Sequence, residues 1–282
     1  MEVIKTVCVC GAGTMGSGIA QVCATAGFVT ILYDLNREIL QKAKTNIENN
    51  LIKLVEKQKL LETEQQQIMQ RLQFTFDSNA CEGEIIIEAI VEKAEAKISL
   101  FNQLLAINNI ETIFASNTSS LSLTEIAKSL KQPEKVIGLH FFNPAPVMKL
   151  VEVVKTEYTN EETLRTVVSF VRSLNKTPVI CNDSPGFIVN RVARPFYIES
   201  LRLTEEGKAS FEIIDMLLED RGFKLGPFKL MDLIGNDINY AVSCSVYEQL
   251  KKPERLKPSD IQKAKVNKGE LGKKTGKGYY QY

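Results

Sequence analysis

The chain contains a single histidine, His140, among its 282 residues. Imidazole is the side chain best suited to proton exchange near neutral pH, so any mechanism in which an imidazole carries a proton must use this residue. One histidine also excludes metal sites built from several imidazoles. The acid we expect to orient the ring is Glu152, in the apolar run 150–154, provided that this run returns as a strand beside His140. A solvated glutamate at a strand end is the competing interpretation.

A glycine-rich loop is the second feature with recognisable chemistry. Gly11, Gly13 and Gly16 form a GxGxxG motif between an apolar run and an expected helix at 15–26, the arrangement that binds a dinucleotide pyrophosphate. Asp34 follows about 20 residues later, where a carboxylate binds the ribose hydroxyls of NAD and repels the 2′-phosphate of NADP. Two alternatives stay open, because Asp34 could simply cap a helix and Arg37 could accept a phosphate.

The six cysteines suggest no metal chemistry. None of them forms a CxxC pair, and we expect Cys8 and Cys10 to point to opposite faces of a strand. A zinc site needs thiolates or imidazoles at ligand spacing, which this set does not offer, so no metal is predicted. Apolar surroundings indicate reduced thiols and a cytoplasmic protein. The six positions are Cys8, Cys10, Cys23, Cys81, Cys181 and Cys244.

A parallel sheet is the element that would position these residues. Short Val/Ile-rich runs alternate with helical stretches, which indicates an α/β doubly wound sheet of Rossmann type. Ligands of such sheets bind beyond the carboxyl ends of the strands, where 88–92, 116–120 and 140–144 also fall. Structural alternatives stay open: 116–120 could be a turn before a helix, His140 a structural imidazole, and 143–146 a rigid proline loop with a cis bond. The expected strands are 3–10, 29–34, 84–88, 113–116, 136–140 and 178–181.

The other stretches are expected to be helical. The polar segment 37–72 is too long for one crossover helix and predicts a helical hairpin projecting from the sheet. Residues 122–125 and 159–162 both match capping boxes. Beyond the turn-rich segment near residue 183 the pattern becomes all-helical, so we predict a dinucleotide-binding domain at 1–183 and a smaller all-α domain at 184–282. Its expected helices are 187–207, 211–220, 228–250 and 258–268.

Composition excludes several classes of protein. Lys and Arg number 35 against 34 Asp and Glu, so no strong field favours nucleic acid or membrane partners. No segment approaches the roughly 20 apolar residues of a membrane span, and the N-terminus does not match a signal peptide. We therefore expect neither a nucleic-acid nor a membrane partner.

The motifs together resemble the 3-hydroxyacyl-CoA dehydrogenase family, most closely the bacterial 3-hydroxybutyryl-CoA dehydrogenases. They are GAGTMGSGIAQ, EAIVE, FASNTSSLSLTEIA, GLHFFNPAPVMKLVEVV, DSPGFIVNR and GKKTGKGYYQY, in family order over nearly the whole chain. The resemblance implies an oxidoreductase of fatty acid or butyrate metabolism. It would use NAD to interconvert short-chain 3-hydroxyacyl-CoA and 3-oxoacyl-CoA.

The resemblance also implies roles for individual residues. His140 matches the catalytic histidine and Glu152 its orienting acid, while Ser119 and Asn190 match a polar pair near the substrate. Lysines of the helical hairpin, with Asn50 where some relatives carry serine, would contact CoA: Lys53, Lys57 and Lys59. The positions expected to contact NAD are Gly11, Ala12, Gly13, Thr14, Met15, Gly16, Asp34, Glu92, Lys97, Ser119, Asn143 and Lys274.

Finally, the resemblance implies a homodimer formed through 184–282, which would also contribute to the substrate site. Three alternatives for function remain at this point. They are a dehydrogenase of longer-chain 3-hydroxyacyl-CoA, a dehydrogenase of a free 3-hydroxy acid, and a non-catalytic, crystallin-like NAD-binding protein.

Overall fold

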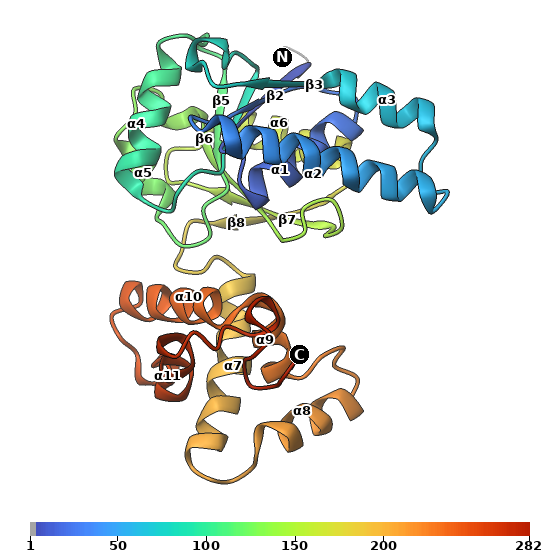
Figure 1. Cartoon of the computed structure of the whole chain (residues 1–282). Coiled ribbons are helices and arrows are strands. Elements are labelled where there is room, and N and C mark those ends of the chain that lie inside the picture. The colour runs from blue at the N-terminus through green and yellow to red at the C-terminus, as the bar shows by residue number, and fades with distance from the viewer. Residues whose placement is uncertain (1–3) are drawn as a thin grey trace. The chain divides into compact units, whose positions relative to one another are not determined.

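The computed structural model describes residues 4–282, so Val3, the expected start of the first strand, lies outside the described residues. The chain divides into two compact units, Met1–Asp183 and Ser184–Tyr282. The first is an α/β unit and the second is built from helices (Figure 1). None of the helices within residues 4–282 is both long and apolar enough to cross a membrane.

An eight-stranded sheet forms the centre of the described part of the first unit, with strand order β3-β2-β1-β4-β5-β6-β7-β8. β6 and β7 pair antiparallel, whereas the other neighbouring strands are parallel. This confirms the predicted mostly parallel, doubly wound α/β class. The strands are β1 Thr6–Cys10, β2 Val29–Tyr33, β3 Leu72–Thr75, β4 Ile85–Glu88, β5 Ile113–Ser116, β6 Val136–Phe141, β7 Leu150–Lys155 and β8 Thr177–Asn182.

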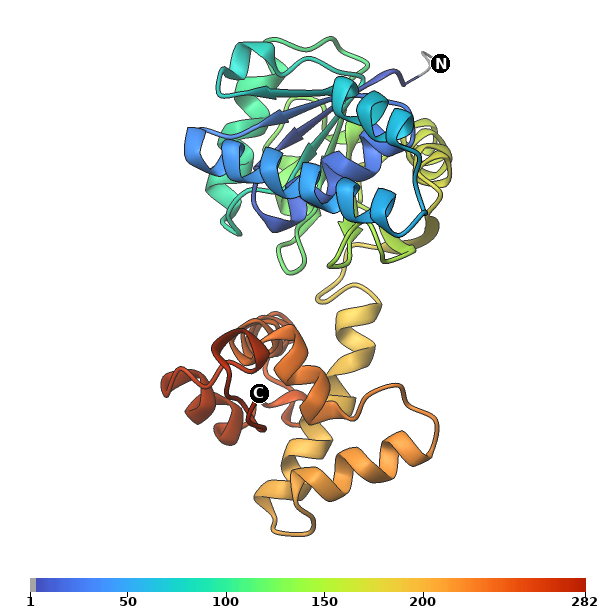
Figure 2. The ribbon, with the colours of Figure 1, turned by 45° about the vertical axis from the view of Figure 1, so that its right-hand side comes forward.

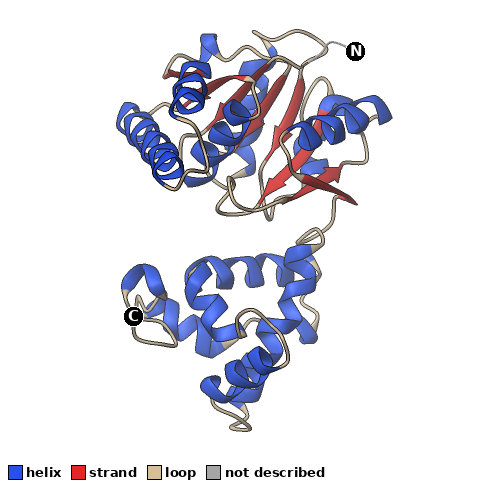
Figure 3. Cartoon of the chain, turned by 90° about the vertical axis from the view of Figure 1, so that its right-hand side faces the viewer, coloured by secondary structure: helices blue, strands red, loops and turns tan. Residues whose placement is uncertain are grey.

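Helices lie on both faces of the sheet (Figure 3). One core packs residues such as Val7 and Val9 of β1 against α1 and α6, and the other packs Cys8 and Cys10 against α4 and α5. The prediction that Cys8 and Cys10 point to opposite faces is therefore wrong, because strand side chains alternate and residues two apart share a face. The helices are α1 Thr14–Thr25, α2 Arg37–Glu56, α3 Glu62–Arg71, α4 Ala94–Leu105, α5 Leu123–Lys128 and α6 Glu161–Ser173.

The segment 37–72 forms the expected pair of helices, α2 and α3, whose connecting turn lies well away from the sheet (Figures 1 and 2). α2 buries Leu40, Ala43, Ile47 and Leu51, which recur at helical spacing along one face. This face packs against α1, which leaves the polar side of α2 exposed. At the end of the pair the chain enters β3, an edge strand that the sequence analysis did not predict.

One of the two predicted helix caps is present and the other differs. Ser122 caps α5 as expected, since its hydroxyl accepts from Glu125 N at 3.3 Å. The predicted cap at Thr159 is wrong: Asn160 caps α6 by accepting from Thr163 N at 2.8 Å. Thr159 instead donates its hydroxyl to Val136 O of β6 at 2.7 Å, so it ties this helix start to the sheet.

The second unit contains more helices than predicted. The single helix expected at 228–250 is wrong, because Gly235 adopts φ 104° and separates α9 from α10. Only glycine occupies this backbone region without strain. The carboxylate of Asp232 in α9 accepts from Tyr279 N and Tyr280 N, both at 3.0 Å, and so anchors the C-terminal segment. The helices are α7 Val189–Glu205, α8 Phe211–Asp220, α9 Pro227–Ile234, α10 Asn236–Gln249 and α11 Asp260–Asn267.

Candidate active site

The candidate site lies at the edge of the sheet where β1, β2, β4, β5 and β6 end, which we call the carboxyl edge. The glycine loop follows β1 and Asp34 follows β2. Glu88 and Ser116 are the last residues of β4 and β5, and both are fully buried. His140 lies one residue before the end of β6. The parallel strands thus bring the predicted loops of the first unit to one edge.

The glycine loop has the geometry of a phosphate-binding turn. Gly11 has φ +100°, and a Cβ there would lie 2.5 Å from Ala89 O, while one on Gly16 would lie 1.7 Å from Gly11 O. These two positions therefore require glycine for close packing. A Cβ on Gly13 would meet nothing within 4 Å, and the first turn of α1, which lies wholly within the described chain, carries no acidic side chain. This uncapped helix N-terminus fits a dinucleotide phosphate.

Asp34 supports the same loop from β2. Its carboxylate accepts from Ala12 N at 2.8 Å and from Asn36 N at 2.9 Å. The cap of α2 is Asn36, which accepts from Glu38 N and Ile39 N, so Asp34 is not the helix cap. The carboxylate therefore lies against the loop on which a ribose would rest.

A cleft of about 500 Å³ adjoins the glycine loop within the first unit. Its lining includes Ala12, Gly13 and Thr14, together with Asn50 and Lys53 of α2. Asn143 and the residues after it, which begin with a cis Asn143–Pro144 bond, line the opposite side. Lys57, the residue after α2, and Lys59, in the following turn, are not among the lining residues. Of the predicted CoA contacts, the structure thus brings Asn50 and Lys53 to the cleft.

Lys176 supports the cleft in a way that the sequence analysis missed. Its ammonium donates to Ala145 O at 2.6 Å and to Met148 O at 2.7 Å, and its side chain is buried. Burial, followed by repulsion from Lys149, lowers the pKa of this amine below its usual value. The two hydrogen bonds fix the loop that follows the cis proline.

His140 and Glu152 form a buried pair. They lie directly opposite each other in the antiparallel β6–β7 ladder, and His140 Nδ1 is 2.6 Å from Glu152 Oε2. Their exposed fractions are 7% and 0%. The pairing makes Nδ1–H the donor to a carboxylate and so fixes the tautomer, which leaves Nε2 as the nitrogen that gains or loses a proton. The adjacent Phe141 N donates to Asn117 Oδ1 at 2.9 Å and ties β6 to the loop after β5.

Glu92 organises the loop that carries Ser119. One of its oxygens accepts from Thr118 Oγ1 at 2.6 Å, Ser119 N at 3.0 Å and Ser120 Oγ at 2.9 Å. Burial opposes ionisation of Glu92, but attraction by Lys97 and these hydrogen bonds outweigh it and lower its pKa. Glu92, which rested on the resemblance alone, therefore lies against the loop that carries Ser119.

Lys97, which also rested on the resemblance alone, links Glu92 to the buried carboxylate of Glu88. Its ammonium is 2.5 Å from Glu88 and 3.2 Å from Glu92, and the lysine is 1% exposed. Glu88 also accepts from Ser116 Oγ at 2.5 Å and Ile90 N at 2.7 Å. Glu88 and Ser116 begin two segments that the sequence analysis placed at this edge, but neither residue was given a role. The sequence contained a sign of their importance, because each is a polar residue at the end of a run of apolar strand residues.

Asn190 and Lys274 belong to the second unit, and their contacts within this unit are as follows. Asn190 lies in the first turn of α7, and its carbonyl accepts from Arg194 Nε at 3.0 Å. Lys274 Nζ is 2.6 Å from Asp237. Their approach to His140 and to NAD stays a prediction.

The fold and the glycine loop define a dinucleotide-binding α/β protein with a helical second unit. Two family models match the chain: the NAD binding domain of 3-hydroxyacyl-CoA dehydrogenase over residues 6–184 and the C-terminal domain of the same enzymes over 186–282. The chain belongs to the 3-hydroxyacyl-CoA dehydrogenase family, as its motifs predicted, and the first match indicates NAD as the cofactor.

Several known proteins are similar over almost the whole chain. A 3-hydroxyadipyl-CoA dehydrogenase of Escherichia coli is 45% identical over 99% of this chain, which spans 59% of that protein's length. A probable 3-hydroxybutyryl-CoA dehydrogenase of Bacillus subtilis is 40% identical to this chain, and the similarity covers 99% of this chain and 98% of the relative. The crystal structure of (S)-3-hydroxybutyryl-CoA dehydrogenase from Ralstonia eutropha superimposes with a TM-score of 0.95 at 35% identity, with 99% of each chain covered.

Proposed function

We propose that the chain interconverts 3-hydroxybutyryl-CoA and acetoacetyl-CoA with NAD(H), using His140 as the acid and base. The observation that carries the proposal is the buried pair of His140 Nδ1 and Glu152 Oε2, 2.6 Å apart at the carboxyl edge. The relatives named as 3-hydroxybutyryl-CoA dehydrogenases support the four-carbon substrate.

When bound, NADH would supply a hydride for the carbonyl carbon of the 3-oxoacyl group. Protonated His140 gives its Nε2 proton to the oxygen as negative charge develops there, and neutral His140 takes this proton back in the reverse direction. Glu152 stabilises the imidazolium and holds the ring in one orientation. Because the carboxylate is buried beside the ring, water does not compete for the hydrogen bond.

Ser119 and Asn190 are proposed to hold the substrate oxygen in line with the nicotinamide, which is a contribution from positioning. The backbone of Ser119 is fixed by Glu92, and this supports the proposal for the first of the two. Lys53 and Asn50 line the cleft beside the glycine loop and are proposed to contact CoA, with Lys57 and Lys59 meeting phosphate further along the hairpin. A homodimer formed through residues 184–282 and a cytoplasmic location complete the proposal.

His140→Gln tests the chemistry, because glutamine keeps hydrogen-bonding capacity but cannot carry the proton. We expect NADH binding and the thermal unfolding midpoint to change little while acetoacetyl-CoA reduction falls by at least the 10²-fold typical of a lost acid–base group. Near-normal turnover in this variant would overturn the assignment. A non-catalytic NAD-binding protein would show no turnover in the wild type either.

The substrate needs a separate measurement, because one relative is named as a 3-hydroxyadipyl-CoA dehydrogenase. The values of kcat/KM should be compared for acetoacetyl-CoA, 3-oxoadipyl-CoA, longer 3-oxoacyl-CoA esters and free acetoacetate, each with NADH and NADPH. The proposal requires acetoacetyl-CoA with NADH to give the highest value. A preference for the dicarboxylic or a longer ester would change the assigned substrate but leave the proposed mechanism unchanged.

A further inference from the structure

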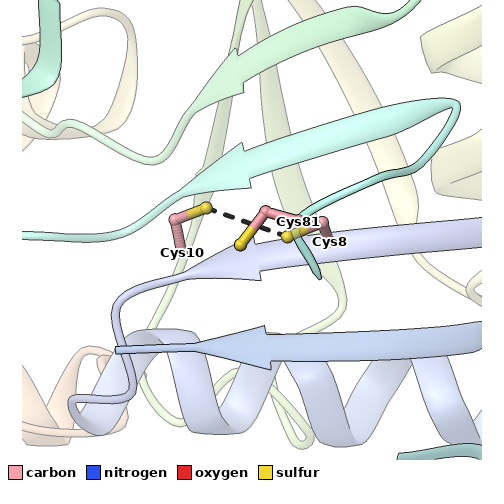
Figure 4. A group of neighbouring side chains, drawn as sticks. All are labelled: Cys8, Cys10 and Cys81. Atoms are coloured by element: carbon pink, nitrogen blue, oxygen red, sulfur yellow. Dashed lines mark hydrogen bonds between the residues drawn. The ribbon is translucent and has the colours of Figure 1, made fainter. Parts of the chain in front are cut away.

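Three thiols converge in the core that α4 and α5 form with the sheet, next to the carboxyl edge (Figure 4). Cys8 and Cys10 come from β1, and Cys81 comes from the segment between the short 3₁₀ turn Ser78–Ala80 and β4. The three sulfur atoms all lie within 4.8 Å of one another, and those of Cys8 and Cys10 are 3.9 Å apart. We call this group the thiol cluster.

The backbone holds the thiol cluster in place. Cys8 and Cys10 share a face because they are two residues apart on a strand that is paired on both sides, to β2 and to β4. Cys81 N donates to Ser78 O at 3.0 Å, and Cys81 O accepts from Asn108 Nδ2 at 2.8 Å. Cys8 and Cys10 are thus fixed by the sheet, and Cys81 is fixed by the preceding turn and by Asn108.

The spacing of the sulfur atoms matches that of a thiolate-coordinated metal ion. A metal–sulfur distance of about 2.3 Å places three sulfurs about 4.0 Å apart around a trigonal ion. The distance between Cys8 and Cys10 is 3.9 Å, and the upper limit for the other two pairs is 4.8 Å. An ion could thus be bound with sulfur shifts of less than about 1 Å. A disulfide would require two sulfurs to approach to about 2.05 Å, a much larger movement.

The surroundings select the class of ion. Each of the three thiols is 0% exposed, and the neighbouring side chains in this core include Ile31, Ile86 and Phe101. Structural zinc is almost always four-coordinate. Among the described residues, the group of potential ligands at this position consists of the three cysteines. A soft cation that accepts two or three thiolates, such as Cu(I), suits such a site better.

Charge leads to the same choice. A bound monovalent cation is neutralised when one thiol loses its proton to solvent, whereas a divalent ion requires two thiols to do so. Net charge left in this apolar core, where the three thiols are 0% exposed, would cost free energy.

We propose that Cys8, Cys10 and Cys81 form a binding site for a soft monovalent cation of the Cu(I) type. The site is separate from the acid–base pair of His140 and Glu152 and does not depend on the proposed activity. Since Cys10 directly precedes Gly11, an ion bound here would fix the strand that presents the glycine loop. Access requires the segment around Cys81 to open, so loading should be slower than the reaction of an exposed thiol.

The test is an anaerobic titration of the fully reduced, full-length protein with Cu(I) in competition with bicinchoninate, repeated with the redox-inert probe Ag(I). We expect one equivalent to bind and the thermal unfolding midpoint to rise. Cys81→Ala and Cys8→Val should each weaken binding at least about 100-fold. Cys23→Ala is the matched control, because Cys23 is also a fully buried cysteine but lies in α1 outside the thiol cluster. It should bind as the wild type does.

Several results would overturn the proposal. These are failure of the wild type to compete with bicinchoninate for one equivalent, equal loss of binding in Cys23→Ala and Cys81→Ala, or tighter binding of Zn(II) than of Cu(I). X-ray absorption on the loaded wild type gives a readout that does not depend on how the variants fold. It should show two or three sulfur neighbours at about 2.3 Å, and nitrogen or oxygen neighbours instead would exclude the thiol cluster.

Discussion

Replacing Glu152 by glutamine removes the charge that faces His140 while keeping the size of the side chain. Glu152 is 0% exposed and its Oε2 lies 2.6 Å from His140 Nδ1, so the charge is not replaced by water. The neutral amide still fits between β6 and β8, the strands that flank β7. We therefore expect Glu152→Gln to fold and to bind NADH as the wild type does.

The loss in turnover follows from the hydrogen bond. A hydrogen bond to a charged group contributes about 1.5–3 kcal/mol, and this contribution is needed most when the ring is an imidazolium. At about 1.36 kcal/mol for each tenfold change in rate, kcat should fall about 10- to 150-fold. The effect should fall on kcat and leave KM for acetoacetyl-CoA nearly unchanged, because Glu152 is proposed to touch the ring and not the substrate.

The assay is steady-state NADH oxidation with acetoacetyl-CoA, accompanied by thermal unfolding and NADH titration. Glu161→Gln is the matched control, since Glu161 is also paired to a cation, with 2.9 Å to Lys155, but its side chain is 64% exposed. It should retain full activity. If Glu152→Gln keeps kcat within twofold of the wild type, or raises KM with kcat unchanged, Glu152 does not orient a catalytic imidazole.

Three other substitutions test the surrounding groups. Asp34→Ala should raise KM for NADH about tenfold or more and reduce the preference over NADPH, because a charged partner of the ribose is lost; an unchanged NADH/NADPH ratio of kcat/KM would contradict this. Lys97→Met leaves the fully buried Glu88 without its cation and should lower the free energy of unfolding by about 3–5 kcal/mol in urea denaturation, and adding Glu88→Gln should recover part of it. The pKa of Glu92 is lowered below 4.5 in the folded state, so its contribution to stability is present above pH 4.5 and lost as the pH falls below it. Urea denaturation at pH ~6 and pH ~3.5 should therefore show a smaller acid-induced loss in Glu92→Gln than in the wild type, and equal losses would count against this ion pair.

Local signals in the sequence predicted most elements of the first unit. Apolar runs bounded by turn residues predicted six of the strands of this sheet, and Ser122 caps a helix as its sequence indicates. β3 was missed because LQFT has four residues, only two of them apolar, and its identity as a strand depends on pairing with β2. That pairing is a tertiary contact, which a local pattern does not contain.

Errors of another kind came from local rules wrongly applied. Gly235 lay inside an apolar helical pattern, and an interior glycine of this kind was the available sign of a break. Cys8 and Cys10 were assigned to opposite faces although the period of a strand is two residues, which places them on the same face. The thiol cluster was thereby overlooked. Cys81 completes it from far along the chain, and no spacing motif would have indicated that contact.

The site residues of the first unit share a sequence signal that does not depend on any resemblance. Glu88, Ser116, His140 and Glu152 are polar residues within or at the end of otherwise apolar strands, and each is at most 7% exposed. Burying such groups costs free energy unless partners are supplied, so a chain that keeps several of them at one edge must pair them. The partners found are Lys97 for Glu88 and Glu152 for His140. The sequence could not predict that β7 pairs antiparallel with β6 in the register that places Glu152 opposite His140. Register between strands is set by contacts across the sheet.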